Sequence, residues 1–253
     1  MEVIKTVDPK EILYEEVLLR RENLKKEAAQ FYISYLKEFG ELLTEAFQRK
    51  VACIKLKKMI AYCQRCKNGG QVIDRTGLNR YIETEMDEYR EYLEQLAEEI
   101  NAARRTKRAS SEVLLQIKEV YYRLAKMIHP DMRPDLAKDI ILKEYWNRIL
   151  IAYQLNDLAE LQELESLVRI YLGSHSSTDN RTLPDLEKQI KKIEEEIERI
   201  INTAPYIYRF LLEDKTEKTK RKNELQREIK EYTEYEKELQ TALNQFEIRE
   251  TYA

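Results

Sequence analysis

The amino-acid sequence predicts an all-α protein of elongated form. Only 5 Gly and 5 Pro interrupt its 253 residues, whereas helix-favouring Glu, Lys, Leu and Ile are abundant. Charged residues make up 36% of the chain, more than the proportion of about a quarter in ordinary globular domains, which indicates long helices with much solvated surface. We expect a long helical hairpin over residues 1–108, a central core over 109–173 and a C-terminal antiparallel coiled-coil hairpin over 181–253.

The first predicted helix covers residues 10–67. Pro9 suits a helix start, and apolar residues recur at spacings of three, four or seven as far as Cys66. Gly40 interrupts this stripe and could kink the helix, because Gly costs about 1 kcal/mol inside a helix. A straight helix of this length would measure about 85 Å, so part of it should project or bend.

The second long helix is predicted over residues 78–105, where an apolar stripe runs from Leu78 to Ile100. The segment 67–70 ends in Gly69 and Gly70, which is a stop signal for the first helix. Two long helices joined by a short Gly-rich connection should fold back on each other as an antiparallel hairpin.

Residues 112–128 are predicted to form an amphipathic helix that ends in a His-Pro-Asp turn. Ser110 and Ser111 provide an N-cap, and His129 ends the helix because the residue before a proline is pushed out of the α region. One face of the helix is apolar and the other is polar and basic. The apolar positions are Leu114, Ile117, Tyr121, Leu124 and Ile128, and the polar and basic positions are Lys118, Tyr122, Arg123 and Lys126.

Two further helices follow the turn. One is predicted over residues 136–155. The next is capped by Asn156 or Asp157, with Glu160 placed for a capping box, and ends near Gly173. Residues 174–180 form the clearest linker in the chain.

The C-terminal part contains two apolar seams. From Leu186 to Ile200 apolar residues step by four and three, which is the heptad pattern of a coiled coil, and a less regular seam runs from Leu225 to Phe246. We expect the two seams to pair as an antiparallel coiled coil. The pattern leaves open whether they pair within one chain or between chains as a homo-oligomer, and the segment 203–224 is ambiguous.

Two groups of residues flank the turn formed by His129, Pro130 and Asp131. They are Ile117, Lys118, Tyr121, Arg123, Leu124, Ala125 and Lys126 before it, and Trp146, Ile149, Ala152 and Tyr153 after it. Together with the turn they resemble the J-domain, the module by which DnaJ-type co-chaperones engage DnaK-type chaperones. The resemblance covers about residues 112–156, and the matching helix on each side makes it far more specific than the tripeptide alone.

The chain departs from the J-domain pattern in three ways. The family's short first helix, with its Tyr-x-x-Leu-Gly opening, is missing before residue 112, and we expect the helix over 78–105 to take its packing role. The usual fourth-helix ending is also missing. Leu150 and Ile151 occupy third-helix positions that are usually polar, so we expect this helix to be covered on a second side by flanking helices. The sequence therefore predicts a J-like core built into a larger helical body.

The resemblance implies a partner and a set of binding residues. In the family, the loop and the basic face of the second helix dock onto the chaperone's nucleotide-binding domain and linker, which promotes ATP hydrolysis and client capture. Since that chemistry occurs in the chaperone, we expect this chain to be no enzyme. The residues carried over are His129, Pro130 and Asp131 as the trigger, and Lys118, Arg123 and Lys126 as cations that steer an acidic partner surface.

We keep two other functions open beside a co-chaperone or adaptor whose helical arms bind a client. His-Pro-Asp also makes a good helix-ending turn, so the J-like pair could persist in a structural interaction scaffold that has lost chaperone stimulation. The third is a nucleic-acid-associated helical protein, which rests on the basic run 215–222 (KTEKTKRK). The net charge of −3 argues against nucleic acid, and a solvated helix face explains the run more simply.

Composition and motifs exclude several other classes. No apolar run reaches membrane-spanning length, the N-terminus lacks a secretory apolar segment, and three cysteines do not suit a disulfide framework, so we expect a cytoplasmic protein. Cys63 and Cys66 form a single C-x-x-C, whereas the zinc modules of DnaJ proteins repeat it, and a closed zinc site needs four ligands. We expect no metal, no cofactor and no catalytic residue, because Gly-rich phosphate loops and nucleophile elbows are also missing.

Overall fold

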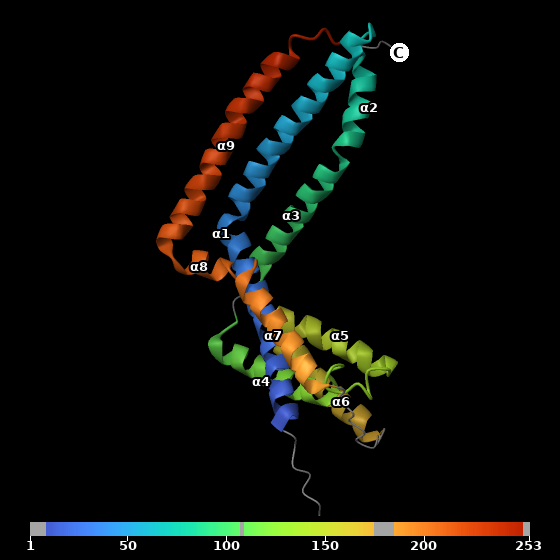
Figure 1. Ribbon diagram of the computed structural model, residues 1–253, viewed down its shortest axis with the longest axis vertical. Helices are drawn as coiled ribbons and strands as arrows, with labels where there is room; N and C mark the ends of the chain where they lie inside the picture. The colour runs from blue at the N-terminus through green and yellow to red at the C-terminus, as the bar shows by residue number, and fades with distance from the viewer. Residues whose placement is uncertain (1–8, 107–108, 175–184, 250–253) are drawn as a thin grey trace, which may run out of the picture. The chain divides into compact units, whose positions relative to one another are not determined.

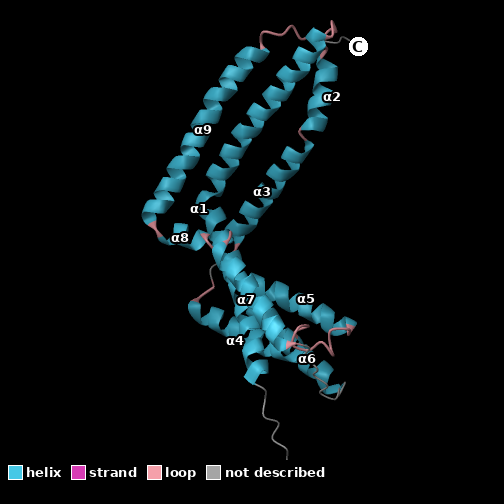
Figure 2. Cartoon of the chain, viewed as in Figure 1, coloured by secondary structure: helices cyan, strands magenta, loops and turns pink. Residues whose placement is uncertain are grey.

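The structure is a computed structural model that describes residues 9–106, 109–174 and 185–249 (Figure 1). Within these ranges it contains nine helices and no strand, which confirms the predicted all-α class (Figure 2). None of the described helices combines the length and apolar character that crossing a lipid bilayer requires. The helices are α1 (Pro9–Asn68), α2 (Arg75–Glu85), α3 (Asp87–Arg105), α4 (Ser111–Ile128), α5 (Ile140–Leu155), α6 (Leu158–Ser174), α7 (Leu186–Asn202), α8 (Tyr208–Glu213) and α9 (Lys215–Leu243).

The described residues group into two compact units. Unit 1 combines the residues up to Tyr32 with Thr106–Arg209, and unit 2 combines Ile33–Arg105 with the residues from Phe210 onward. Helix α1 contributes its first segment to unit 1 and the rest to unit 2. Both units therefore join segments that are distant in sequence, and each unit has its own hydrophobic cluster.

Unit 2 is a bundle built on the second part of α1. The predicted hairpin is present, because α2 and α3 run antiparallel to α1, as the ring contacts Tyr62–Tyr81 and Phe47–Tyr92 show. The predicted helix over 78–105 is interrupted at Met86, so that α2 and α3 are separate helices. Helix α9 runs parallel to α1, with Lys222 paired to Glu38 near its start and Leu243 buried beside Leu56 near its end (Figure 1).

Gly40 does not break α1, which is helical through this position. Its role is the close approach of α3, because a Cβ added at Gly40 would lie 2.9 Å from Cγ1 of the buried Ile100. The expected kink is absent, and Gly40 instead lets the Ile100 side chain pack directly against the backbone of α1, so that any larger residue would force Ile100 to shift.

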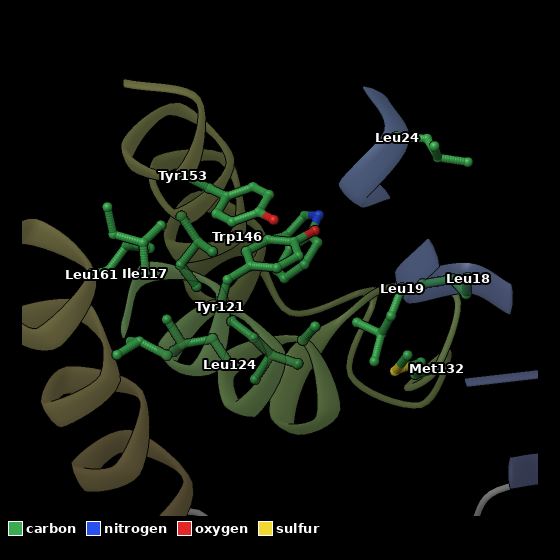
Figure 3. Close-up of a cluster of buried hydrophobic side chains, with 14 of the residues drawn as sticks. Leu18, Leu19, Leu24, Ile117, Tyr121, Leu124, Met132, Trp146, Tyr153 and Leu161 are labelled. Carbon is green, nitrogen blue, oxygen red and sulfur yellow. The ribbon is translucent and has the colours of Figure 1, made fainter. Parts of the chain in front are cut away.

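Unit 1 packs α4, α5 and α6 against one another and against the first segment of α1. Helix α4 runs antiparallel to α5, because Tyr121 stacks on Tyr153 at one end and His129 meets Trp146 at the other. The two tyrosine rings lie 3.8 Å apart at an interplanar angle of 11°, and Figure 3 shows them facing each other beside Trp146. The helical pair that the sequence predicts on both sides of the turn is thus present.

The structure corrects the predicted partners of two helices. The segment that covers the α4–α5 pair is the start of α1, whose Leu18 and Leu19 are buried in the same cluster, and not the helix over 78–105, which belongs to unit 2. The seam of α7 is buried in the cluster of unit 1, whereas Leu239 and Leu243 of α9 belong to the cluster of unit 2, so the two seams predicted to pair lie in different units. A narrow apolar stripe fits any complementary helix, and spacing alone does not choose the partner.

Several predicted boundaries change in detail. Helix α5 starts at Ile140, capped by Asp139, because residues 136–138 form turns. Asn156 ends α5 in the left-handed region, while Asp157 caps α6 by accepting a bond from the N–H of Glu160. Beyond Ser174 the predicted linker lies outside the described residues, and the ambiguous segment 203–224 contains α8 and the start of α9.

The prediction that α5 is covered on a second side is correct for one residue and wrong for the other. Leu150 is partly buried against the cluster of unit 1. Ile151 is 58% exposed, because the next residue along a helix points about 100° away from its neighbour.

We predict that Gly40→Leu destabilises unit 2. A side chain at Gly40 would displace the packed Ile100, and overpacking of this kind costs about 1–3 kcal/mol, so the urea midpoint for loss of the helical circular-dichroism signal should fall. Gly173→Leu is the matched control, because an added Cβ there meets nothing within 4 Å. Equal effects of the two substitutions would contradict the close approach of α3.

Candidate functional site

The candidate site is the turn at the end of α4. The helix begins where the side chain of Ser110 accepts a bond from the N–H of Val113, and it ends with the bond from the N–H of His129 to the carbonyl of Ala125 at 2.9 Å. Pro130 has no N–H to extend the helix, so the chain turns at this point. The predicted trigger residues therefore lie at the tip of the α4–α5 hairpin.

His129 is the internal anchor of the turn. Its side chain is among the buried polar groups at 4% exposure, and its ring meets the Trp146 ring edge-on at 4.6 Å between centroids. Nδ1 accepts a bond from the backbone N–H of Asp131 at 3.0 Å, and the His129 carbonyl accepts from Met132 and Arg133. Burial lowers the pKa of His129 to about 4, so the imidazole is neutral at pH 7 and Nδ1 is an acceptor.

Asp131 is the part of the turn that solvent reaches most. Its side chain is 49% exposed, and Oδ2 lies 3.3 Å from Nη2 of Arg21. The carbonyl of Asp131 accepts a bond from the hydroxyl of Tyr14 at 3.2 Å. Burial, with a contribution from the Asp131 carboxylate, raises the pKa of Tyr14 to about 12, which keeps this hydroxyl a donor. The first segment of α1 thus contacts the turn through two residues.

Arg21 connects three parts of unit 1. Its guanidinium pairs with Glu22 of α1, with Asp131 of the turn and with Glu196 of α7, while its own side chain is only 12% exposed. A cavity of about 430 Å³ lies here between α1, the turn and α7, with Pro130 and Ile193 in its lining. No sequence pattern indicates Tyr14 or Arg21 as part of the site, because both are more than 100 residues from the turn and only the tertiary fold brings them there.

Arg123 and Lys126 are exposed, and each has an acidic partner within unit 1. Both guanidinium nitrogens Nε and Nη2 of Arg123 donate to Glu165 of α6, at 2.8 and 2.9 Å. Glu165 also accepts from Arg169, and the two guanidinium groups lower its pKa to about 2. Lys126 lies 3.3 Å from Glu15 of α1.

Lys118, the third predicted cation, is half-buried. Its ammonium lies 5.5 Å from the centroid of the Tyr122 ring on the next turn of α4. The predicted basic face is thus accessible at two of its three cations, and both of those cations take part in ion pairs.

The other motifs contribute no second site. Cys53, Cys63 and Cys66 are free thiols buried in unit 2, and burial raises the pKa of Cys53 and of Cys63. No group of three or more His, Cys, Asp or Glu side chains in the described part of the chain could hold a metal ion. The basic run 215–222 forms the first turns of α9, where three of its cations pair with carboxylates. These pairs are Lys220–Glu217, Arg221–Glu224 and Lys222–Glu38.

Comparison of the chain with protein-family models, with curated proteins and with the solved structures finds no match. The case for a function therefore rests on the residues of the turn and on the contacts that surround them.

We predict that the protein loses stability as the pH falls from about 6.5 to about 4, the ordinary and the folded-state pKa of His129. The unfolded chain binds the imidazole proton more tightly than the folded state, so the contribution is complete above pH 6.5 and is lost as the pH falls, by about 3 kcal/mol in full.

Urea unfolding at several pH values checks this prediction. The measurement is made with His175→Gln in the background, so that His129 is the only histidine left to titrate. His129→Gln in that background should flatten the slope between pH 6.5 and 4. Equal slopes for the two proteins would show that His129 is not the buried neutral group described above.

Proposed function

We propose that this chain is a J-like co-chaperone or adaptor that engages a DnaK-type chaperone through the His-Pro-Asp turn. The observation that carries the proposal is the form of the turn: His129 is fixed against Trp146 while the Asp131 carboxylate beside it stays half-exposed. A partner would therefore meet a preformed loop, which loses little conformational freedom on binding.

The antiparallel α4–α5 pair supports the same proposal. Tyr121, Trp146 and Tyr153 come from both helices, and they pack together so that the turn projects from the end of the pair. These three residues are among those on which the resemblance to the J-domain rests. The proposal includes a second activity, in which the helical bundle of unit 2 serves as the arm for a client or adaptor.

The basic face of α4 could serve docking at small energetic cost. Arg123 and Lys126 already hold carboxylates of α6 and α1, but their side chains are 47% and 58% exposed. Ion pairs near the surface are worth about 0–1 kcal/mol, so an acidic partner surface can replace Glu15 at Lys126 without a large penalty. Arg123 donates two bonds to Glu165, which is only 13% exposed, so Arg123 would keep this pair and meet the partner with the exposed part of its side chain. Cations at an exposed surface also raise the rate of encounter with acidic partners.

We predict that the wild-type protein raises single-turnover ATP hydrolysis by the DnaK-type chaperone of its own organism, and that His129→Gln removes this stimulation. Gln cannot supply both the buried ring against Trp146 and the acceptor for the Asp131 N–H, so the loop loses its form. Asp131→Asn, which retains an oxygen acceptor for Arg21, tests the carboxylate separately and should also remove stimulation. A wild-type protein that gives no stimulation would overturn the proposal.

A structural scaffold is the second candidate, and the contacts of Arg21 favour it. Arg21 and Tyr14 tie the turn to α1, and Arg21 also ties it to α7, so the turn has internal partners of its own. In a scaffold the turn would serve only to make these contacts within unit 1, and it would bind no chaperone.

Arg21→Gln distinguishes the two candidates. In a co-chaperone it frees Asp131, so chaperone affinity should rise about two- to fivefold, the equivalent of up to about 1 kcal/mol, in a titration of ATPase stimulation. In a scaffold the variant lowers the melting temperature and stimulation stays absent. Arg49→Gln is the matched control, because it removes a single interhelical pair, with Glu236, in unit 2.

A further inference from the structure

An apolar groove lies in unit 1 at the opposite end of α4 from the turn. Its volume is about 500 Å³, and α1, α4 and α5 contribute its walls. Phe31, Leu114, Leu115 and Tyr153 form the apolar part of the lining. Leu114 and His129 are 15 residues apart in α4 and its cap, which corresponds to roughly 20 Å along the helix. The groove is therefore separate from the His-Pro-Asp turn, and Lys118 is the one residue of the proposed chaperone site that also lines it.

The groove contains a partly buried ammonium group without an acidic partner. Nζ of Lys26 lies 3.7 Å from the centroid of the Tyr153 ring. Lys26 makes no ion pair within the part of the chain that the structure describes, and burial lowers its pKa to about 8. An aromatic ring attracts the ammonium but carries no net charge, so the positive charge of Lys26 is not neutralised and still attracts an anion.

The charges around Lys26 favour an acidic ligand. Lys118 lines the groove as a second ammonium. The lining contains a single carboxylate, that of Glu27. Its two oxygens already accept hydrogen bonds, from Asn23 at 3.1 Å and from Tyr206 at 3.5 Å. The net charge of the groove is thus positive.

The exposure of the lining favours a polypeptide over a small molecule. Leu115 is 63% exposed and Leu114 is 38% exposed, so the apolar wall continues onto the open surface of α4. Sites for small molecules enclose most of their ligand, whereas a peptide that lies across a groove can cover an open leucine with its own side chains.

We propose that this groove binds an acidic amphipathic segment of a partner protein. A leucine or aromatic side chain of the segment enters between Phe31 and Leu115, and a neighbouring carboxylate pairs with Lys26. Because the carboxylate needs the charged ammonium, affinity falls as the pH rises through about 8, the pKa of Lys26 in the free protein. This inference does not depend on the chaperone proposal.

A peptide library displayed on phage and selected on the full-length protein tests the proposal. We expect the enriched sequences to place Asp or Glu within one helical turn of Leu, Phe or Trp. Synthetic peptides of these sequences should bind the wild type, and their affinity should fall about tenfold with Lys26→Gln and with Leu115→Ser, as for central residues of an interface. Lys26→Arg should retain binding at pH 7 and remove the loss between pH 7 and 9.

Three controls make the outcome decisive. Ile151→Ser removes an equally exposed apolar side chain elsewhere on unit 1 and should leave binding unchanged. Asp131→Asn should also leave it unchanged, because this half-exposed side chain is far from the lining, and the result separates this groove from the His-Pro-Asp turn. Dodecanoate and anionic vesicles are tested for competition. Enriched peptides without acidic residues, binding indifferent to Lys26 and Leu115, or binding of dodecanoate or vesicles with no peptide enriched would each overturn the proposal.

Discussion

The stacking of Tyr121 on Tyr153 is the contact on which unit 1 depends. The two rings lie 3.8 Å apart and fix the spacing of α4 and α5, so that Trp146 comes to lie beneath the turn, where it meets His129. Aromatic pairs of this kind bury a large area and allow little rotation, so they set the register of the two helices as well as holding them together. The form of the turn follows, because a His129 ring held by Trp146 presents Nδ1 to the N–H of Asp131.

Charge decides how far this turn is open to a partner. Arg21 holds Asp131 and Glu196 from a largely buried position, whereas the side chains of Arg123 and Lys126 stay about half-exposed while they hold Glu165 and Glu15. An exposed pair exchanges partners at little cost, but a guanidinium with three carboxylates and little access to water is harder to displace. The Arg21 cluster is therefore the place where a co-chaperone and a scaffold differ physically, although both have the same helical pair and the same tripeptide.

Apolar spacing predicted which residues of each helix are buried more reliably than it predicted their partners. Ile190, Ile193 and Ile197 are buried as their heptad spacing requires, but they are buried in the cluster of unit 1, whereas α9 belongs to unit 2. Gly40 shows the same limit, since a glycine in a helix indicates a weak position, while the presence of Ile100 opposite it is a property of the packed bundle. Local periodicity reports which face of a helix is apolar and contains no information on which other helix will cover it.

The sequence by itself determined the helical class, the ends of α4, the polar and apolar faces of that helix and the position of His129, Pro130 and Asp131 at its end. These features depend on residues within a few turns of one another, through caps, spacing and the restriction that proline places on the residue before it. Only the tertiary structure decided that Tyr14 and Arg21 contact the turn, that Glu165 holds Arg123 and that Lys26 lies over Tyr153 in an apolar groove. Each of these contacts joins residues more than 40 positions apart, and such pairs meet only when the helices pack.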